Sequence, residues 1–172
     1  MESKPKVEPT NEDWIKLAAF IDGEGSISIK NLTTKTGRYS QLFVAIANTD
    51  PRLPMWCRDR FGGLLYGSDD NAKKSNKQRR FWRWITHSAQ AESIIRGCLP
   101  HFLLKREQAE VALAYRKTFR FKGGKGSTRI ITDAELAIRQ SCREELRRLK
   151  REIPEDAFVG APLPANPKET IQ

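Results

Sequence analysis

The hydrophobic positions of this chain recur with helical spacing over residues 11–22 and with strand spacing soon afterwards. Thr10 and Asp13 have the spacing of a capping box, which predicts that the first helix begins directly after Thr10. Gly23 and Gly25 follow the apolar run, and we expect them to end this helix. The folded part of the chain is therefore expected to open with a short amphipathic helix.

A pair of strands is predicted after this helix, and the same order then repeats once. Residues 26–30 alternate between polar and apolar, residues 42–47 form a strongly strand-like run, and the polar segment between them is typical of a hairpin connection. An Asp-Pro pair supplies the start of a second helix over residues 51–61. A second pair of strands is expected at residues 63–67 and 79–86.

Three further helices are expected in the C-terminal half. Residues 88–99 form one that ends at Pro100, and residues 105–119 form the next. A capping box of Thr132 and Glu135 begins the last, which carries an amphipathic stripe. The order is α-β-β-α-β-β-α-α-α, which predicts an α+β fold. Its four strands can pair into one antiparallel sheet with helices on one face and the other face free for a ligand.

Length and proline content indicate one folded domain. The 172 residues are enough for one core and too few to promise two. We assign the domain to residues 10–152, after a flexible N-terminus over residues 1–9. Residues 153–172 contain four prolines and are expected to be a disordered tail.

The charge is strongly positive: 31 Lys and Arg against 21 Asp and Glu give a formal net charge of +10. Such a balance favours a polyanionic partner, most often nucleic acid, although ribosomal and membrane-surface proteins share it. Three scattered cysteines and two histidines argue against a zinc or disulfide framework. No apolar run approaches the ~18 residues of a membrane span, so we expect a soluble, intracellular protein without a membrane partner. The bacterial cytoplasm and an organelle both stay open.

The segment LAAFIDGEG, residues 17–25, places two acids, Asp22 and Glu24, at the end of a predicted helix. A helix C-terminus carries partial negative charge, so acids are unfavourable there unless a positive group meets them. An acidic turn after an amphipathic helix is the simplest interpretation. It leaves the positive partner unexplained.

This segment resembles the LAGLIDADG motif of the homing endonucleases, with Glu24 in the place of the catalytic acid. Ala19 replaces the more usual glycine, whereas Phe20 and Gly23 are common variants. The order α-β-β-α-β-β-α, over about residues 10–119, is also the core of that family. The identical motif positions are Leu17, Ala18, Ile21, Asp22 and Gly25.

One motif per chain implies a homodimer in this family, with the two motif helices packed across a twofold axis. Ala19 and Gly23 are four residues apart, and small residues at that spacing let two helix backbones approach closely. The interface implied by the resemblance consists of Leu17, Ala18, Ala19, Asp22 and Gly23.

The resemblance also implies a divalent metal site. Two copies of Glu24 near one axis would repel each other, and bound Mg²⁺ would offset this repulsion. The Gly23 carbonyl is the second implied ligand, and Asp22 is expected to support the helix end and the interface. Mn²⁺ is expected to substitute for Mg²⁺, and no organic cofactor is implied.

Three further positions match the polar periphery of single-motif active sites. Asn48 takes the place of a glutamine that orients water or a metal ligand, and Arg52 that of an arginine near the scissile bond. Lys105 aligns with a lysine that supports hydrolysis as a charge stabiliser. With Glu24 they form the expected catalytic set, although each could also be an ordinary surface residue.

The four strands are expected to form a saddle on double-stranded DNA. Ser28 and Lys30 share one face of the first strand, and Arg79 and Arg83 share one face of the last. Arginine on such a ribbon can read guanine in the major groove, whereas loop lysines grip phosphates. Trp82 and Trp84 have the opposite parity to Arg83 and are assigned to the core. The expected DNA-binding residues are Ser28, Lys30, Arg38, Gln41, Lys73, Lys74, Lys77, Arg79 and Arg83.

The resemblance thus implies an intron-encoded, site-specific DNA endonuclease. It would make a staggered, Mg²⁺-dependent double-strand cut in a long pseudo-palindromic target. A non-catalytic RNA maturase and a DNA-binding regulator on the same fold are the alternatives. A basic structural protein of the ribosomal kind would not explain the motif.

Overall fold

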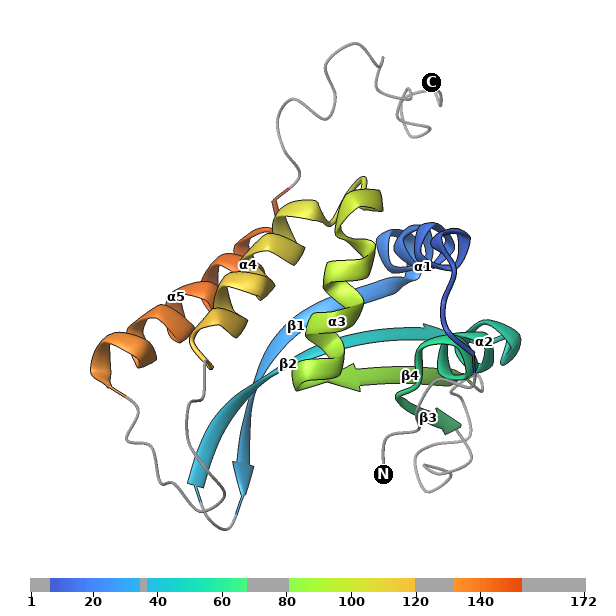
Figure 1. Ribbon diagram of the computed structural model, residues 1–172. Coiled ribbons are helices and arrows are strands. Elements are labelled where there is room, and N and C mark those ends of the chain that lie inside the picture. The colour runs from blue at the N-terminus through green and yellow to red at the C-terminus, as the bar shows by residue number, and fades with distance from the viewer. Residues whose placement is uncertain (1–6, 35–36, 68–80, 120–131, 153–172) are drawn as a thin grey trace, which may run out of the picture.

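The computed structural model describes residues 7–34, 37–67, 81–119 and 132–152. A four-stranded antiparallel sheet lies against a layer of helices (Figure 1), so the α+β class expected from the sequence is confirmed. The elements are α1 (Asn11–Glu24), β1 (Gly25–Thr34), β2 (Gly37–Asn48), α2 (Arg52–Phe61), β3 (Leu64–Gly67), β4 (Trp82–His87), α3 (Ser88–Cys98), the 3₁₀ turn η2 (Leu99–His101), α4 (Arg106–Lys117) and α5 (Asp133–Arg148).

The strand order is β1-β2-β4-β3, so β2 and β4 lie in the centre of the sheet. Ile29 of β1 lies opposite Leu42 of β2, and Ala45 of β2 lies opposite Ile85 of β4. The hairpin of β1 and β2 is longer than its neighbours and extends away from them (Figure 1). This register fixes which side chains share a face of the sheet.

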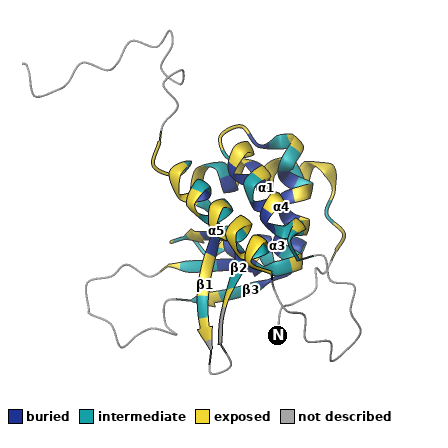
Figure 2. Cartoon of the chain, turned by 90° about the vertical axis from the view of Figure 1, so that its left-hand side faces the viewer, coloured by how far each residue is buried: buried dark blue, intermediate teal, exposed yellow. Residues whose placement is uncertain are grey.

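The two faces of the sheet differ in their cover. Ile27 and Ile29 of β1 and Leu42 and Val44 of β2 are buried beneath the helices. Their alternate neighbours point the other way, and Lys30 is exposed there. Helices α1, α3, α4 and α5 lie together on the covered side (Figure 2). In the described part of the chain, these helices leave the opposite face of the sheet uncovered, as the sequence predicted.

Trp84 anchors the central strand β4 in the core. Its side chain is fully buried, and its indole N–H donates to the Gly62 carbonyl over 2.6 Å. Gly63 has a φ of 95°, and a Cβ there would lie 2.8 Å from the Ile85 carbonyl oxygen, so the turn requires glycine. The core position predicted for Trp84 is confirmed. Trp82 is only half-buried.

The first helix is longer than its sequence predicted. Both expected capping boxes are present, but α1 continues through Gly23 to Glu24. Gly25 ends it with an extended backbone, and its N–H donates to the Ile21 carbonyl. A Cβ on Gly25 would lie 2.6 Å from the Ile21 Cα. Gly23 therefore belongs to the helix, because glycine costs a helix only about 1 kcal/mol, which packing elsewhere can offset.

The cysteines are free thiols. Cys57 and Cys98 are buried and Cys142 is half-buried. Burial raises the pKa of the Cys98 thiol to about 12, so it stays protonated at neutral pH. None of the described helices is both long and apolar enough to cross a membrane.

Candidate active site

The end of α1 is tied to the start of α4 by the carboxylate of Asp22. Its Oδ2 accepts the backbone N–H groups of Leu103 and Leu104 over 2.8 and 3.2 Å. Its Oδ1 accepts the N–H of Lys105 over 2.9 Å. These amides precede the first turn of α4, where a helix has unpaired donors and partial positive charge. The positive partner of Asp22 is therefore the set of backbone N–H groups directly before α4 of the same chain.

Lys105 completes this connection in the reverse direction. Its Nζ donates to the carbonyl of Ile21 over 2.8 Å and also to the carbonyl of Asp22. Both carbonyls lie in the last turn of α1. Burial lowers the pKa of Lys105 from its ordinary value, and the Asp22 carboxylate opposes that shift. The ammonium thus holds the helix end that precedes Glu24. This contact places Lys105 beside the motif, while its role in hydrolysis stays a prediction.

Glu24 is in the opposite situation to Asp22, two residues earlier. It is the last residue of α1, it is exposed, and its carboxylate makes no hydrogen bond or ion pair with any residue in the described ranges. A hollow of about 280 Å³ is lined by Glu24 and Asn48, together with Ala47, Thr49 and Phe81. The structure therefore brings Glu24 and Asn48 together, with an uncompensated carboxylate at one side.

Asn48 and Arg52 share a second hollow, of about 530 Å³, between α1 and α2. The Asn48 Oδ1 accepts the N–H of Asp50 over 2.9 Å. The Arg52 guanidinium donates to both oxygens of Asp50, from Nε, over 2.9 and 3.0 Å. These hydrogen bonds lower the pKa of Asp50 to about 2. Asn48 borders both hollows and therefore lies between Glu24 and Arg52. Asp50 also lines the second hollow, and the sequence did not predict it as a site residue.

The donor set at Glu24 fits a hard divalent cation. The Glu24 carboxylate and the Gly23 carbonyl are oxygen ligands of the kind that Mg²⁺ prefers. Within the described part of the chain, no group of three or more His, Cys, Asp and Glu side chains could by itself hold a metal ion. Mg²⁺ usually keeps several waters and is bound through one or two carboxylates together with substrate phosphates, which this small donor set allows.

The residues of α1 that are exposed, and so could contact a partner chain, are only part of the expected interface. Leu17 and Ala18 have no exposed surface and pack into the core of their own chain, so they must be removed from the proposed interface. Ala19 and Gly23 are exposed, and a Cβ on Gly23 would meet nothing within 4 Å. Phe20, with 39% of its surface exposed, borders the same side. Asp22 is half-buried and bonded to its own chain, so its role is internal.

The expected DNA-binding residues that can be placed lie on the free face of the sheet. Lys30 is paired with Gln41 across the hairpin, and its ammonium lies 5.4 Å from the centre of the Phe43 ring. Gln41 donates to the Ser88 hydroxyl over 2.8 Å. Arg83 carries a buried Nε without a partner in the described residues. Ser28 shares this face by its parity in β1.

The remaining expected contacts lie outside the described residues. They are Lys73, Lys74, Lys77, Arg79 and the side chain of Arg38.

Lys150 follows the end of α5, and the sequence predicted no role for it. Burial, followed by the positive charges of Lys30 and then Lys105, lowers its pKa. Lys150 therefore carries its charge where those of Lys30 and Lys105 are also felt. The sequence shows Lys150 only as one of several basic residues in a predicted helix, and nothing there distinguishes it from its neighbours.

Comparison with solved structures finds the same fold in several proteins of low sequence identity. The archaeal intron-encoded homing endonuclease I-Vdi141I, solved in complex with DNA, has a TM-score of 0.62 at 11% identity, covering 81% of this chain and 84% of that one. The homing endonuclease I-CvuI, solved with its target in the presence of Ca, has a TM-score of 0.53 at 15% identity, with 83% and 98% covered. The LAGLIDADG homing endonuclease I-GzeII, also bound to DNA, has a TM-score of 0.58 at 16% identity, and 89% of this chain matches 50% of that chain. No family model and no curated protein matches the sequence.

Proposed function

We propose, from the LAGLIDADG homing endonuclease fold that this protein has, that it is a site-specific DNA endonuclease. It would act as a homodimer and make a metal-dependent, staggered cut in both strands of a long pseudo-palindromic target. The observation that carries this proposal is the carboxylate of Glu24, which has no partner among the described residues and shares a hollow with Asn48 at the end of α1. A protein that only binds DNA gains nothing from an uncompensated acid facing phosphate.

The proposed metal is Mg²⁺, held by the Glu24 carboxylate and the Gly23 carbonyl, with Mn²⁺ as a substitute. A bound divalent cation supplies stabilisation of negative charge on phosphate oxygens and lowers the pKa of water. Asn48 would orient a water through its amide, because its position on both hollows faces Glu24 and Arg52. Arg52 would exchange Asp50 for a phosphate oxygen, which a guanidinium contacts equally well. Lys105 would keep the end of α1 in place through the Ile21 carbonyl.

The proposed dimer is supported by two features. This chain matches half of I-GzeII, so two copies would supply what one longer chain contains. The exposed side of α1 carries apolar and small residues, including Ile15 with 46% of its surface exposed. Leu103 and Leu104 are 86% and 70% exposed beside the same helix end. Joining two copies across Ala19 and Gly23 would cover such residues and bring both Glu24 carboxylates near one axis.

Duplex DNA is the proposed substrate because of the charge and shape of the sheet. The chain has a formal net charge of +10, and Lys30, Gln41 and Arg83 share the free face. A major groove about 12 Å wide admits a two-stranded ribbon such as β1 and β2. Two copies related by a twofold axis would match the two half-sites of a pseudo-palindrome.

A cleavage selection tests the proposal. Purified protein is incubated with a randomised pseudo-palindromic duplex library and Mg²⁺, and the new DNA ends are sequenced. We expect one family of related sites with overhanging ends, no cleavage in EDTA, and restored cleavage with Mn²⁺. If the gene lies in an intron, the joined flanking sequence should be cut as well.

Two other outcomes would contradict the enzyme proposal. Selective retention of duplexes that are never cut, at any divalent metal tested, would indicate a DNA-binding regulator. Selective binding of intron RNA in place of duplex DNA would indicate a maturase.

A further inference from the structure

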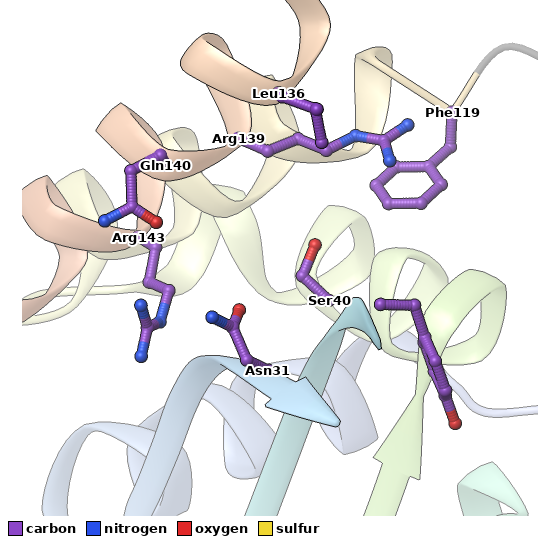
Figure 3. A pocket seen from close by; sticks show the side chains of 8 residues that line it. Asn31, Ser40, Phe119, Leu136, Arg139, Gln140 and Arg143 are labelled. Carbon is purple, nitrogen blue, oxygen red and sulfur yellow. The ribbon is translucent and has the colours of Figure 1, made fainter. Parts of the chain in front are cut away.

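A cavity of about 310 Å³ lies between α5, the end of α4 and the outer parts of β1 and β2 (Figure 3). Asn31 and Ser40, which pair across the hairpin, form its floor and have the parity of the buried Ile29 and Leu42. The cavity is therefore on the helix side of the sheet, opposite Lys30. It shares no lining residue with either hollow at Asn48. Its walls are Asn31, Tyr39, Ser40, Phe119, Leu136, Arg139, Gln140 and Arg143.

The cavity is positively charged, since two arginines and no acid line it among the described residues. Arg139 is held by neutral partners: its Nε donates to the Thr118 hydroxyl over 2.9 Å and one terminal nitrogen donates to the Thr118 carbonyl over 3.2 Å. Its guanidinium also lies 3.8 Å from the centre of the Phe119 ring. None of these contacts neutralises its charge. Arg139 therefore contributes a fixed positive charge to the wall.

Arg143 carries the clearest sign of a missing partner. Its Nε is buried and has no hydrogen-bond partner in the part of the chain that the structure describes. Its side chain lies in the cavity near Asn31 (Figure 3). Buried donors are nearly always paired, and a charged donor is the most costly to leave unpaired. No hydrogen bond or ion pair joins its terminal nitrogens to any described residue either, so these nitrogens can donate to an acceptor in the cavity.

Two neutral groups offer donors to the same space. The Tyr115 hydroxyl donates to the Ser40 Oγ over 2.9 Å, so the Ser40 O–H is left to donate elsewhere. The side-chain amide of Asn31 lies beside it on the paired strand. Gln140 is less available, because its amide already donates to Glu144. Guanidinium, hydroxyl and amide donors thus reach the cavity from a helix and two strands.

We propose that this cavity binds a phosphate-type oxyanion. Donors arriving from separate directions suit the several oxygens of a tetrahedral phosphate better than the two coplanar oxygens of a carboxylate. Two arginine charges match a group that is singly or doubly negative. The phosphate belongs either to a small molecule or to a nucleic-acid backbone, both of which present the same oxygens. This site is separate from the proposed cleavage site and does not depend on it.

Calorimetric titration of the full-length protein with inorganic pyrophosphate, without divalent metal, tests the site. We expect saturable binding that Arg143→Met weakens by about tenfold or more, because the variant keeps the apolar stem and loses the charged donors. Arg147→Met is the matched control: it removes an exposed arginine from the same helix outside the cavity and should change affinity less than about twofold. Circular dichroism confirms that each variant is folded, and Asn31→Ala serves as a second probe of the cavity.

Competition distinguishes the two sources of phosphate. If a nucleic-acid backbone is the occupant, saturating pyrophosphate should weaken binding of a non-target duplex to the wild type more than to Arg143→Met. If a small phosphate is the occupant, duplex affinity should change equally in both proteins. Absence of saturable pyrophosphate binding overturns the site, as does equal binding by the wild type, Arg143→Met and Asn31→Ala.

Discussion

Asp22 and Glu24 stand two residues apart at the end of one helix, and their surroundings are opposite. Asp22 accepts three backbone N–H groups from the segment directly before α4 and is bonded within its own chain. Glu24 is exposed and makes no polar contact with the described residues. An acid that is fully satisfied holds the fold together, whereas an acid without a partner is available for a ligand. The contrast separates the structural carboxylate of the motif from the proposed catalytic one.

The largest effect on stability is expected from Asp22. Asp22→Ala leaves three N–H groups without their acceptor and should lower the free energy of unfolding by about 3 kcal/mol. Urea denaturation followed by tryptophan fluorescence measures this loss. Glu24→Ala, at the same helix end, should change the free energy by less than about 0.5 kcal/mol. Equal losses in the two variants would remove the distinction between the two acids.

Lys105 should have the next largest effect, and its pH dependence has a definite sign. Lys105→Met removes two hydrogen bonds to the end of α1 and should cost about 1–2 kcal/mol at neutral pH. Because the pKa of Lys105 is lowered on folding, the unfolded chain binds more protons just below its ordinary value of 10.5. The contribution of this group to stability should therefore rise with pH in that window. The difference between wild type and Lys105→Met, measured by denaturation from about pH 8 to 10, should widen, and a narrowing would contradict the assigned shift.

Gly23 should affect the dimer and the single chain in opposite directions. Gly23→Ala adds a methyl group where nothing lies within 4 Å and should stabilise the helix of one chain by about 0.5–1 kcal/mol. The same methyl group should weaken the proposed dimer by about tenfold, because it holds the two helices apart. Sedimentation equilibrium measures the second effect. Gly97→Ala is the control, since its Cβ would lie 2.5 Å from Trp14 and should destabilise the single chain.

The smallest effect is expected at the Asp50–Arg52 pair. With a pKa of about 2, Asp50 stays ionised across the physiological range and keeps Arg52 paired in the absence of DNA. Asp50→Asn should release Arg52 and tighten DNA binding about two- to fivefold at low salt, with little effect at high salt. Fluorescence anisotropy at two salt concentrations measures this change. Asp59→Asn, at another aspartate paired with an arginine of α2, should leave DNA affinity unchanged.

Local signals in the sequence predicted much of the fold. Thr10 with Asp13 and Thr132 with Glu135 are neighbours in the chain, so the capping boxes needed no tertiary information. The parity of Trp84 likewise placed it in the core. The end of α1 was misplaced because the weak preference of a glycine against helix was overridden by packing.

The candidate site was less predictable, because it depends on contacts across the fold. Asp22 accepts hydrogen bonds from residues more than 80 positions later in the sequence. No local sequence pattern predicts such a contact. The motif also does not reveal which side of α1 is buried. Leu17, Ala18 and Ile21 are buried in the core, whereas Ala19 and Gly23 are exposed. The catalytic roles of Glu24 and its neighbours remain predictions.

The most direct test compares cleavage by wild type and Glu24→Gln on the selected target. The substitution keeps the size of the side chain and removes the charge. The account predicts that Glu24→Gln binds the target as tightly as wild type and cuts it about 10³-fold more slowly or not at all, with no gain from added Mg²⁺ or Mn²⁺. Glu12→Gln, an exposed acid at the other end of α1, should cut at the wild-type rate. Metal-dependent cleavage by Glu24→Gln at that same rate would contradict the account.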